Sequence, residues 1–293
     1  MRAGTGQARR LSTMVAFPID KQVLSDRTFE AITALIYEAI GLSLNASKKS
    51  LVASRLGPRI QRLGLGGFDD YLALLRDEAE AAEFQMAVDL LTTNETYFFR
   101  EPAHYQVLEQ ELASRSNKNA PLAVWSAASS FGDEAYSTAM LLADLQQAGR
   151  IGADWHILGT DISHRVLLAA KEAVYPEDRL RNVSPERLRR YCLRGEGPAQ
   201  GQAMIQARLR ERVRFGQLNL CKPFSGIGPF DVVFLRNVLI YFDAETKRQV
   251  VDRVVATLRP GGLFFLGTAE GRVPAEVPLT VIVPGAFRKP SKV

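Results

Sequence analysis

The hydrophobic positions near the start of the chain recur at helical spacing. In FEAITALIYEAI the apolar residues follow one helix face from Phe29 to Ile40. The segment SKKSLVASRLGPRIQRLGL continues this pattern, and we expect Pro58 to bend or interrupt its helix. DDYLALLRD and AEFQMAVDLLTT predict two further short helices. The pattern indicates a small all-helical domain over residues 21–90, preceded by a flexible arm over residues 1–20.

A different pattern begins at Ala120, where apolar strands alternate with helices. PLAVWSAAS, WHILGTD and FDVVFLRN are short, nearly continuous apolar runs, which are typical of buried parallel strands. Their alternation with helical segments predicts a doubly wound, Rossmann-like α/β domain over residues 120–293. Residues 178–215 interrupt the pattern with a basic helix and a glycine-rich turn, which indicates an inserted small subdomain. Residues 91–119 link the two domains.

The composition narrows the class of protein. No apolar run of the 293 residues approaches the ~20 that cross a bilayer, so we expect no membrane insertion. The first twenty residues lack the apolar core and cleavage site of a secretory signal, which favours a cytoplasmic protein. Cys192 and Cys221 and three scattered histidines form no ligand set, so we expect no metal.

Basic residues gather in two parts of the chain, and the net charge is +5. Residues 41–62 contain five basic residues and no acid. Residues 171–222 contain twelve basic residues against six acidic ones. Two basic surfaces imply an acidic partner, and charge alone leaves nucleic acid, anionic lipid and acidic protein open.

The first loop of the α/β domain carries acids where a dinucleotide site carries glycines. Ligands of such sheets bind beyond the carboxyl ends of the strands. SAASSFGDEAYS lacks the G-x-G-x-x-G pattern, and Asp133 and Glu134 begin the following helix. Two carboxylates there would repel a pyrophosphate and would suit an ammonium or sulfonium group. This favours S-adenosylmethionine over NAD, although acids in a first helical turn also complement the helix dipole.

Polar residues also follow the later strands. Asp161 ends the second strand, where a carboxylate can bind both hydroxyls of a ribose or cap the next helix. Asn219 follows a short segment, and Arg236 and Asn237 end a strand too apolar to need them. Their alternative interpretation is that polar residues merely mark the strand end.

These motifs and the aromatic stretch LTTNETYFFREP together resemble one family, the CheR chemotaxis receptor glutamate O-methyltransferases. LTTNETYFFRE resembles LTTNxTxFFRE, WSAASSFGDEAYS resembles WSAACSTGEEPYS, and FDVVFLRNVLIYFD resembles FDxIFCRNVLIYFD. LRPGGLFFLGTAE resembles LxPGGxLFLGHSE, and RYCLRGEGPAQG resembles the inserted β-subdomain of the family. The resemblance covers residues 25–288 and implies methyl transfer from S-adenosylmethionine to receptor glutamates, with S-adenosylhomocysteine as the product.

The resemblance also implies roles for individual residues. It assigns the cofactor to Asn94, Thr96, Arg100, Glu134, Asp161, Asn219, Leu220, Arg236 and Asn237. Glu134 would lie near the methionine portion and Asp161 on the ribose. Arg100 and Tyr241 are the catalytic candidates, because they would orient the reacting carboxylate.

The same resemblance implies the partner. The basic stretch with Lys48, Lys49, Arg55, Arg59 and Arg62 would dock on the cytoplasmic domain of a chemoreceptor, unless it is only a solvated helix face. The inserted subdomain would bind a receptor's C-terminal tether peptide, as it does in some family members. The sequence shows no coiled-coil pattern, so a monomer is the default expectation.

Departures from the family pattern keep two alternatives open. Phe131 is bulky and Ala135 replaces a proline in the cofactor loop, and the family's His-Ser-Glu reads Thr268-Ala269-Glu270. A non-catalytic module that binds S-adenosylmethionine or S-adenosylhomocysteine would explain the altered loop. A nucleic-acid methyltransferase is disfavoured, because the Asn/Asp-Pro-Pro-aromatic motif is replaced by Asn237-Val238-Leu239-Ile240.

Overall fold

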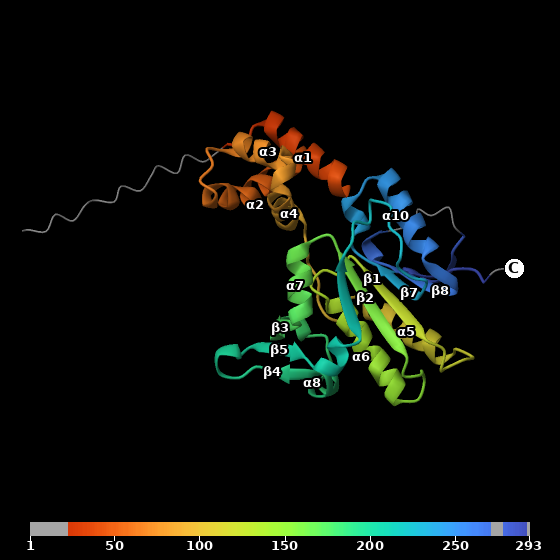
Figure 1. The fold of residues 1–293 in the computed structure, drawn as a ribbon. Helices are drawn as coiled ribbons and strands as arrows, with labels where there is room; N and C mark the ends of the chain where they lie inside the picture. The colour runs from red at the N-terminus through yellow and green to blue at the C-terminus, as the bar shows by residue number, and fades with distance from the viewer. Residues whose placement is uncertain (1–22, 271–277, 292–293) are drawn as a thin grey trace, which may run out of the picture.

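The computed structural model describes residues 23–270 and 278–291. The predicted arm over residues 1–20 lies outside these residues. Figure 1 shows a helical module beside a larger sheet domain. A small second sheet lies on the same side of the large sheet as the module. None of the helices in the described ranges combines the length and the apolar character that a bilayer crossing requires.

Four helices form the N-terminal module. They are α1 (Asp26–Ile40), α2 (Lys49–Arg62), α3 (Phe68–Arg76) and α4 (Ala81–Leu91). Ser25 caps α1 by accepting the Thr28 N–H at 3.0 Å, and Gly41 ends the helix with a left-handed φ of 72°. The apolar faces of the four helices meet in one buried cluster, so the helical prediction is confirmed.

Pro58 does not interrupt α2, which runs unbroken from Lys49 to Arg62. A proline inside a helix removes one N–H and crowds the preceding turn. Val52, Leu56 and Ile60 are fully buried on the same helix, so packing against the module core outweighs that local cost. Tertiary packing therefore decides the course of this helix.

The large sheet has seven strands. They are β1 (Leu122–Ala127), β2 (Trp155–Asp161), β6 (Val213–Gln217), β7 (Phe230–Leu235), β8 (Leu258–Leu266), β9 (Thr280–Val283) and β10 (Ala286–Arg288). The spatial order is β6-β2-β1-β7-β8-β10-β9. The five strands from β6 to β8 are parallel, and β10 pairs antiparallel with both its neighbours. The order reverses between β1 and β7, which is the position where doubly wound sheets bind ligands.

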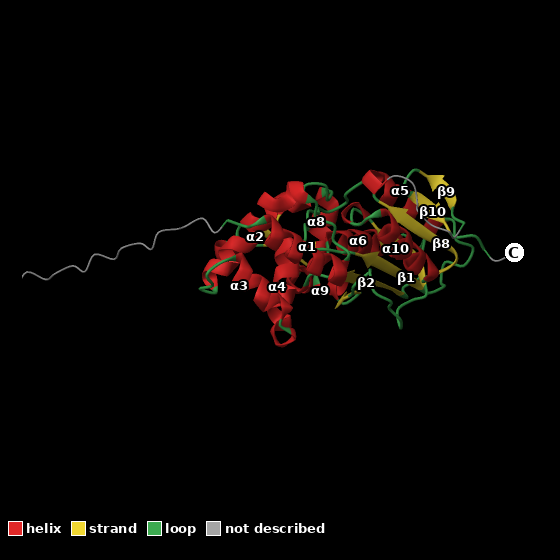
Figure 2. Ribbon diagram, turned by 90° about the horizontal axis from the view of Figure 1, so that it is seen from above, coloured by secondary structure: helices red, strands yellow, loops and turns green. Residues whose placement is uncertain are grey.

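Helices cover both faces of this sheet, as the strand pattern predicts. On one face α5 (Pro102–Ala113) and α6 (Asp133–Gln147) contribute to a large apolar core. On the other, α10 (Ala244–Ala256) packs its valines against the sheet. Successive β1 residues alternate between the two cores, with Val124 in the first and Trp125 in the second. Figure 2 shows the four helices of the module to one side of this layered domain.

A three-stranded antiparallel sheet forms the inserted subdomain. Its strands are β3 (Val174–Pro176), β4 (Cys192–Arg194) and β5 (Gln202–Ile205), in the order β3-β5-β4. The helices α7 (His164–Glu172), α8 (Pro185–Tyr191) and α9 (Ala207–Arg210) precede, interrupt and follow this sheet. The small sheet therefore starts before residue 178, and β6 belongs to the large sheet. As an edge strand, β6 is only partly buried, and its sequence therefore looks like part of the insertion.

The segment between the module and the sheet contains helix α5, which the linker interpretation did not include. Pro102 occupies the first position of α5, where its missing N–H costs nothing. Tyr105, Leu108 and Leu112 of this helix are buried in the main core. The part of the segment before Pro102 crosses between the domains without helix or strand after Leu91, and it turns at residues 98–101.

Candidate active site

A cavity lies at the carboxyl ends of β1, β2 and β7, with about 970 Å³ of empty space that includes its opening to solvent. Its walls come from the end of α1, the extended part of the linker, the loops after the three strands, and the chain after β6. All ten residues that the sequence assigned to cofactor and catalysis line it, and they are Asn94, Thr96, Arg100, Glu134, Asp161, Asn219, Leu220, Arg236, Asn237 and Tyr241. Their individual roles remain predictions.

The sequence did not identify the contribution of the helical module to this cavity. Ile40 and Leu42 form part of the wall, although they lie in the other domain. Their apolar spacing gave no signal beyond an ordinary helix core. Asn219 connects the domains, because its Nδ2 donates to the Ala39 carbonyl at 2.8 Å and its Oδ1 accepts the Cys221 N–H at 3.0 Å.

Asp161 holds the loop after β1 in place. One carboxylate oxygen accepts the Ser130 N–H at 2.9 Å, and the other accepts the Ser163 N–H at 2.9 Å. Burial raises the pKa of Asp161, and these backbone N–H groups oppose that shift. The cap of α7 is Ser163, so Asp161 is not the N-cap that the alternative interpretation proposed. Each of its oxygens can accept a further hydrogen bond from a ligand hydroxyl.

Only one of the two adjacent acids faces the cavity. Glu134 lines it and accepts hydrogen bonds from Ser126 Oγ at 2.7 Å and Arg236 Nη1 at 3.1 Å. Asp133 is fully buried and pairs with Arg179, whose Nε lies 3.1 Å from Oδ1. Burial raises the pKa of Asp133 to about 6, although the Arg179 charge opposes this. Neighbouring helix residues point about 100° apart, so of the two acids at the start of α6 only Glu134, the one that the resemblance assigned to the cofactor, lines the cavity.

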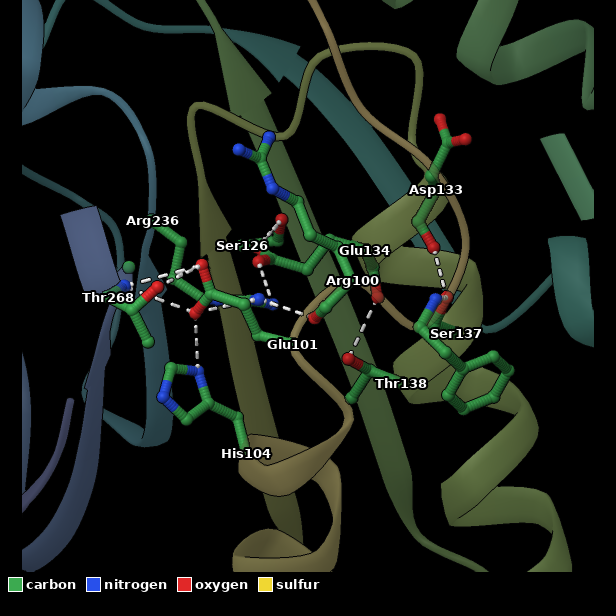
Figure 3. A network of polar contacts seen from close by, with 12 residues as sticks. Arg100, Glu101, His104, Ser126, Asp133, Glu134, Ser137, Thr138, Arg236 and Thr268 are labelled. Carbon is green, nitrogen blue, oxygen red and sulfur yellow. Dashed lines mark hydrogen bonds and ion pairs between the residues drawn. The ribbon is translucent and has the colours of Figure 1, made fainter. Parts of the chain in front are cut away.

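Arg236 organises a buried network that includes Glu101, His104 and Glu134, called the Arg236 network below (Figure 3). The Arg236 residue is 6% exposed. Its guanidinium pairs with Glu134 Oε2 at 3.1 Å and Glu101 Oε2 at 3.3 Å, and it donates to the Arg100 carbonyl. The predicted cofactor residue Arg236 thus lines the cavity while its charge is held by two carboxylates. The sequence placed Glu101 in a motif without suggesting this contact.

The two catalytic candidates lie in the same cavity. Arg100 donates from Nη1 to the Glu95 carbonyl at 2.9 Å, and its guanidinium carbon lies 5.8 Å from the Tyr97 ring centre. Within the described ranges, Arg100 has no ion-pair partner. Tyr241 sits in a short turn after β7, and its carbonyl accepts the Ser43 N–H at 3.0 Å. Arg100 therefore offers an uncompensated positive charge to a ligand.

A half-buried acid, Glu270, shapes the turn that carries Asn237 and Tyr241. Glu270 accepts the Val238 and Leu239 N–H groups at 2.8 Å and the Gly267 N–H at 2.7 Å. Asn237 has a φ of 60°, and a Cβ at Gly267 would come 2.7 Å from its Nδ2. Thr268 and Ala269 depart from the family pattern, yet Glu270 keeps the contacts that fix this turn.

The altered cofactor loop leaves the cavity open. Phe131 is not one of the lining residues, and its ring lies 4.7 Å from the Arg179 guanidinium carbon on the side of the inserted subdomain. Tyr175 donates its hydroxyl to the Phe131 carbonyl at 2.7 Å. Ala135 is fully buried, and α6 begins at Asp133 without the proline. Neither departure puts a side chain in the way of a ligand.

The basic residues expected to dock on receptors differ in their contacts and exposure. Arg55 donates from Nη1 to the Leu91 carbonyl at 2.6 Å, which ties α2 to the end of α4. Arg59 pairs with the buried Glu83, with Nε–Oε1 at 3.0 Å and Nη2–Oε2 at 2.5 Å, and Lys49 pairs with an aspartate of α1 at 2.5 Å. Lys48 and Arg62 are exposed. Arg55 and Arg59 therefore have contacts within the module in addition to any docking role.

The carboxylates and the apolar wall of the cavity fit S-adenosylmethionine. Asp161 can accept from ribose hydroxyls, and Glu134 can accept from an ammonium group. The apolar wall of Ile40, Leu42 and Leu220 suits a flat base.

Comparison with known proteins gives the same answer. Residues 27–92 match the family model "CheR methyltransferase, all-alpha domain", and residues 94–279 match "CheR methyltransferase, SAM binding domain". The chain is 40% identical to the chemotaxis protein methyltransferase of Escherichia coli K12, over 86% of this chain and 86% of that protein. It is also 40% identical to the Klebsiella aerogenes protein of the same name, over 90% and 89% of the two chains. Chemotaxis protein methyltransferase 2 of Pseudomonas aeruginosa is 40% identical over 84% and 87%. The chain therefore belongs to the CheR family of S-adenosylmethionine-dependent methyltransferases.

Proposed function

We propose that the protein transfers a methyl group from S-adenosylmethionine to glutamate side chains of chemoreceptors, giving glutamate methyl esters and S-adenosylhomocysteine. The observation that carries this proposal is the convergence of the assigned residues on one cavity, with the unpaired Arg100 among them. The names of the similar proteins support chemotaxis as the process. Receptor glutamates would be reached in the cytoplasm.

The cavity residues divide the work between the two substrates. Asp161 would bind the ribose hydroxyls, Glu134 the ammonium group, and Asn219, Leu220 and Asn237 the adenosine. Asn94 and Thr96 would form the linker side of the methyl-transfer region. Arg236 would act through Glu134, because its guanidinium is already paired. S-adenosylmethionine supplies a methyl carbon activated by its sulfonium.

The chemistry asks for positioning and not for proton transfer. A glutamate side chain, with an ordinary pKa of ~4.3, is already a carboxylate nucleophile at neutral pH. Arg100 and Tyr241 would hold that carboxylate in line with the methyl carbon. Alignment of this kind contributes through proximity, which is most effective when the reacting atoms lie ~3–3.5 Å apart. No histidine lines the cavity among the described residues, in keeping with this mechanism.

The partner surfaces follow from the exposed charges. Lys48 and Arg62 lie at the two ends of α2 and are the exposed members of the basic stretch. They would contact an acidic receptor. A groove beside the three-stranded sheet has an apolar floor that includes Leu180, Val183 and Leu188. A receptor tether peptide would bind there. The proposal requires neither nucleic acid nor a membrane.

The structure offers no support for the two alternatives. A non-catalytic binding module was motivated by the altered loop, but Phe131 and Ala135 leave the cavity unobstructed. A nucleic-acid methyltransferase was motivated by the basic charge, but many of the subdomain arginines are paired. Arg187 and Arg190 both pair with Asp144, and Arg194 pairs with Glu177.

The test is transfer of tritiated methyl from S-adenosylmethionine to receptor cytoplasmic fragments, prepared with and without their C-terminal tails. We expect incorporation that base treatment releases, as a carboxyl methyl ester requires. Incorporation that withstands base would contradict the ester. Tight cofactor binding with no transfer to any receptor fragment would favour the non-catalytic module.

A further inference from the structure

Glu101 occupies a backbone conformation that calls for an explanation. Its φ is 59° and that of Phe99 is 52°, a left-handed region that non-glycine residues rarely adopt. Such residues persist where the surrounding structure holds them, and they cluster at functional sites. The turn directs the Arg100 carbonyl and the Glu101 carboxylate onto the same guanidinium, that of Arg236 (Figure 3).

The Arg236 network contains one more negative charge than positive charges. Arg236 is in contact with two carboxylates, of which Glu134 lines the cavity and Glu101 does not. His104 does not cancel the excess, because burial and the Arg236 charge lower its pKa. Burial acts to raise the pKa of Glu101, but neighbouring positive charge, with Arg236 first, holds it below its ordinary value. Removal of Glu101 would leave Arg236 and Glu134 as a neutral pair.

We infer that Glu101 is a positioning residue that draws the Arg236 guanidinium away from Glu134, so that Glu134 keeps a net attraction for the ammonium group of the cofactor. The inference rests on the proposed function, since it assumes that the cavity binds an S-adenosyl amino acid. Glu101 does not touch the ligand and acts only through Arg236. The cofactor's amino-acid end is therefore recognised by two carboxylates, one facing it and one behind.

A purely structural role for Glu101 has a different signature. Glu101 also accepts the Thr268 N–H at 3.3 Å, which links the start of α5 to the chain after β8. If Glu101 only held this fold contact, its loss would weaken every ligand of the cavity alike. If it acts on Glu134, only ligands with an ammonium group would lose affinity.

Two probes separate these outcomes. S-adenosylhomocysteine carries the ammonium group, and 5′-methylthioadenosine shares its adenosine and thioether but lacks the amino-acid end. We expect Glu101→Gln to weaken S-adenosylhomocysteine about tenfold in calorimetry, which is the scale of one charge-assisted contact. Binding of 5′-methylthioadenosine should stay within about twofold. Glu109→Gln, an exposed acid of the same helix, is the matched control and should change neither.

Equal weakening of both ligands, or of neither, would overturn the inference while the proposed function stands. Failure of the unaltered protein to bind S-adenosylhomocysteine would instead refute the proposed function, and the inference with it. A double-mutant cycle with Glu134→Gln adds a second criterion, because two changes that act on one contact are not additive. If Glu101→Gln does not fold, Glu101→Asp keeps the charge but withdraws it from Arg236, and it should show the same selective loss in weaker form.

Discussion

Arg100 differs from the other buried or half-buried arginines of the site in having no carboxylate partner among the described residues. Arg236 pairs with Glu101 and Glu134, and Arg179 pairs with Asp133. Within the described ranges, the Arg100 side chain donates to the Glu95 carbonyl and lies beside the Tyr97 ring. A side chain in this state can meet a substrate carboxylate without first breaking an ion pair.

We therefore predict that Arg100→Ala lowers kcat for receptor methylation about 100-fold, because the carboxylate loses its orientation. The melting temperature should change little, since Arg100 makes one backbone contact and is not a core residue. Steady-state methylation assays and thermal unfolding provide the measurements.

Arg181→Ala is the matched control for this experiment. Arg181 lies 5.0 Å from the same Tyr97 ring but does not line the cavity. Near-normal turnover in Arg100→Ala, or an equal loss in both variants, would refute the orienting role of Arg100.

At this scale the sequence predicts which residues gather but not how each side chain is used. All ten assigned residues line one cavity, because the ends of parallel strands meet at one sheet edge. The local pattern of acids did not by itself separate Asp133 from Glu134, because only the helix phase decides which of two adjacent acids faces a ligand. The carboxylate partners of Arg236 are the N-cap residue of α5 and a residue of α6, both distant from Arg236 in sequence, so no local pattern predicts them.

Among the elements, α2 is held to α4 by an ion pair of Arg59, a residue that the sequence of α2 suggests to be on the surface. The spacing of Arg55, Arg59 and Arg62 predicts a basic helix face. In the fold, Arg59 neutralises Glu83, which is 6% exposed and also accepts the Tyr71 hydroxyl at 2.8 Å. The acid that makes this arginine structural lies on α4, so spacing within α2 could not reveal it.

We predict that Arg59→Met destabilises the protein by about 3 kcal/mol at neutral pH, because a buried carboxylate loses its partner. Burial acts to raise the pKa of Glu83, but the bonds from Arg59 and Tyr71 outweigh it and lower that pKa. A lowered pKa contributes stability above the unfolded value of ~4.3 and loses it as the pH falls through the folded value.

Urea unfolding against pH checks both parts of this prediction. In Arg59→Met only burial and Tyr71 remain, so protonation of Glu83 should relieve the penalty and narrow the gap to the unaltered protein as the medium is acidified. Arg62→Met, in the exposed last turn, should cost less than about 0.5 kcal/mol. A gap that widens on acidification would contradict the assigned pair.

Gly41 ends α1 at a point where the module contacts the sheet domain. Its φ is 72°, and a Cβ there would lie 2.5 Å from Cys221 Sγ. We predict that Gly41→Ala costs more stability than Gly64→Ala, which has a similar φ of 69° but open space around its Cβ. The backbone strain alone should cost about 1 kcal/mol in both variants.

The difference between the two glycine variants, measured by urea unfolding, isolates the steric clash. Adding Cys221→Ala to Gly41→Ala should recover most of that difference, because it removes the sulfur. Equal losses of stability in the two single variants would show that the contact between Gly41 and Cys221 adjusts to the added Cβ without strain.

On the scale of the whole molecule, the proposed receptor-docking residues lie on the helical module, and most of the cavity lies in the sheet domain. The most exposed charges of the basic stretch lie on the helical module, and the carboxyl ends of the strands carry the cavity. The sequence predicted both domains and the inserted sheet. The extent of the insertion and the burial of α5 escaped it, because an edge strand and a linker helix carry weak apolar patterns.

We predict that the double reversal Lys48→Glu and Arg62→Glu lowers kcat/KM for receptor fragments at low salt and flattens its dependence on salt. Exposed charges act mainly on association, and salt screens them. Affinity for S-adenosylhomocysteine should remain unchanged, since neither residue lines the cavity. Arg76→Glu, on α3 of the same module, is the control. An equal loss in that variant would show that net charge, and not a specific docking surface, causes the effect.

The module wall of the cavity couples ligand binding to the contact between the two domains. Ile40 and Leu42 face the ligand space, and the Asn219–Ala39 contact fastens that wall to the sheet domain. A ligand that contacts this wall stabilises the contact between the module and the sheet domain by mass action. By reciprocity, any receptor that shifts the module on docking must change cofactor affinity, and the cofactor must change receptor affinity by the same factor.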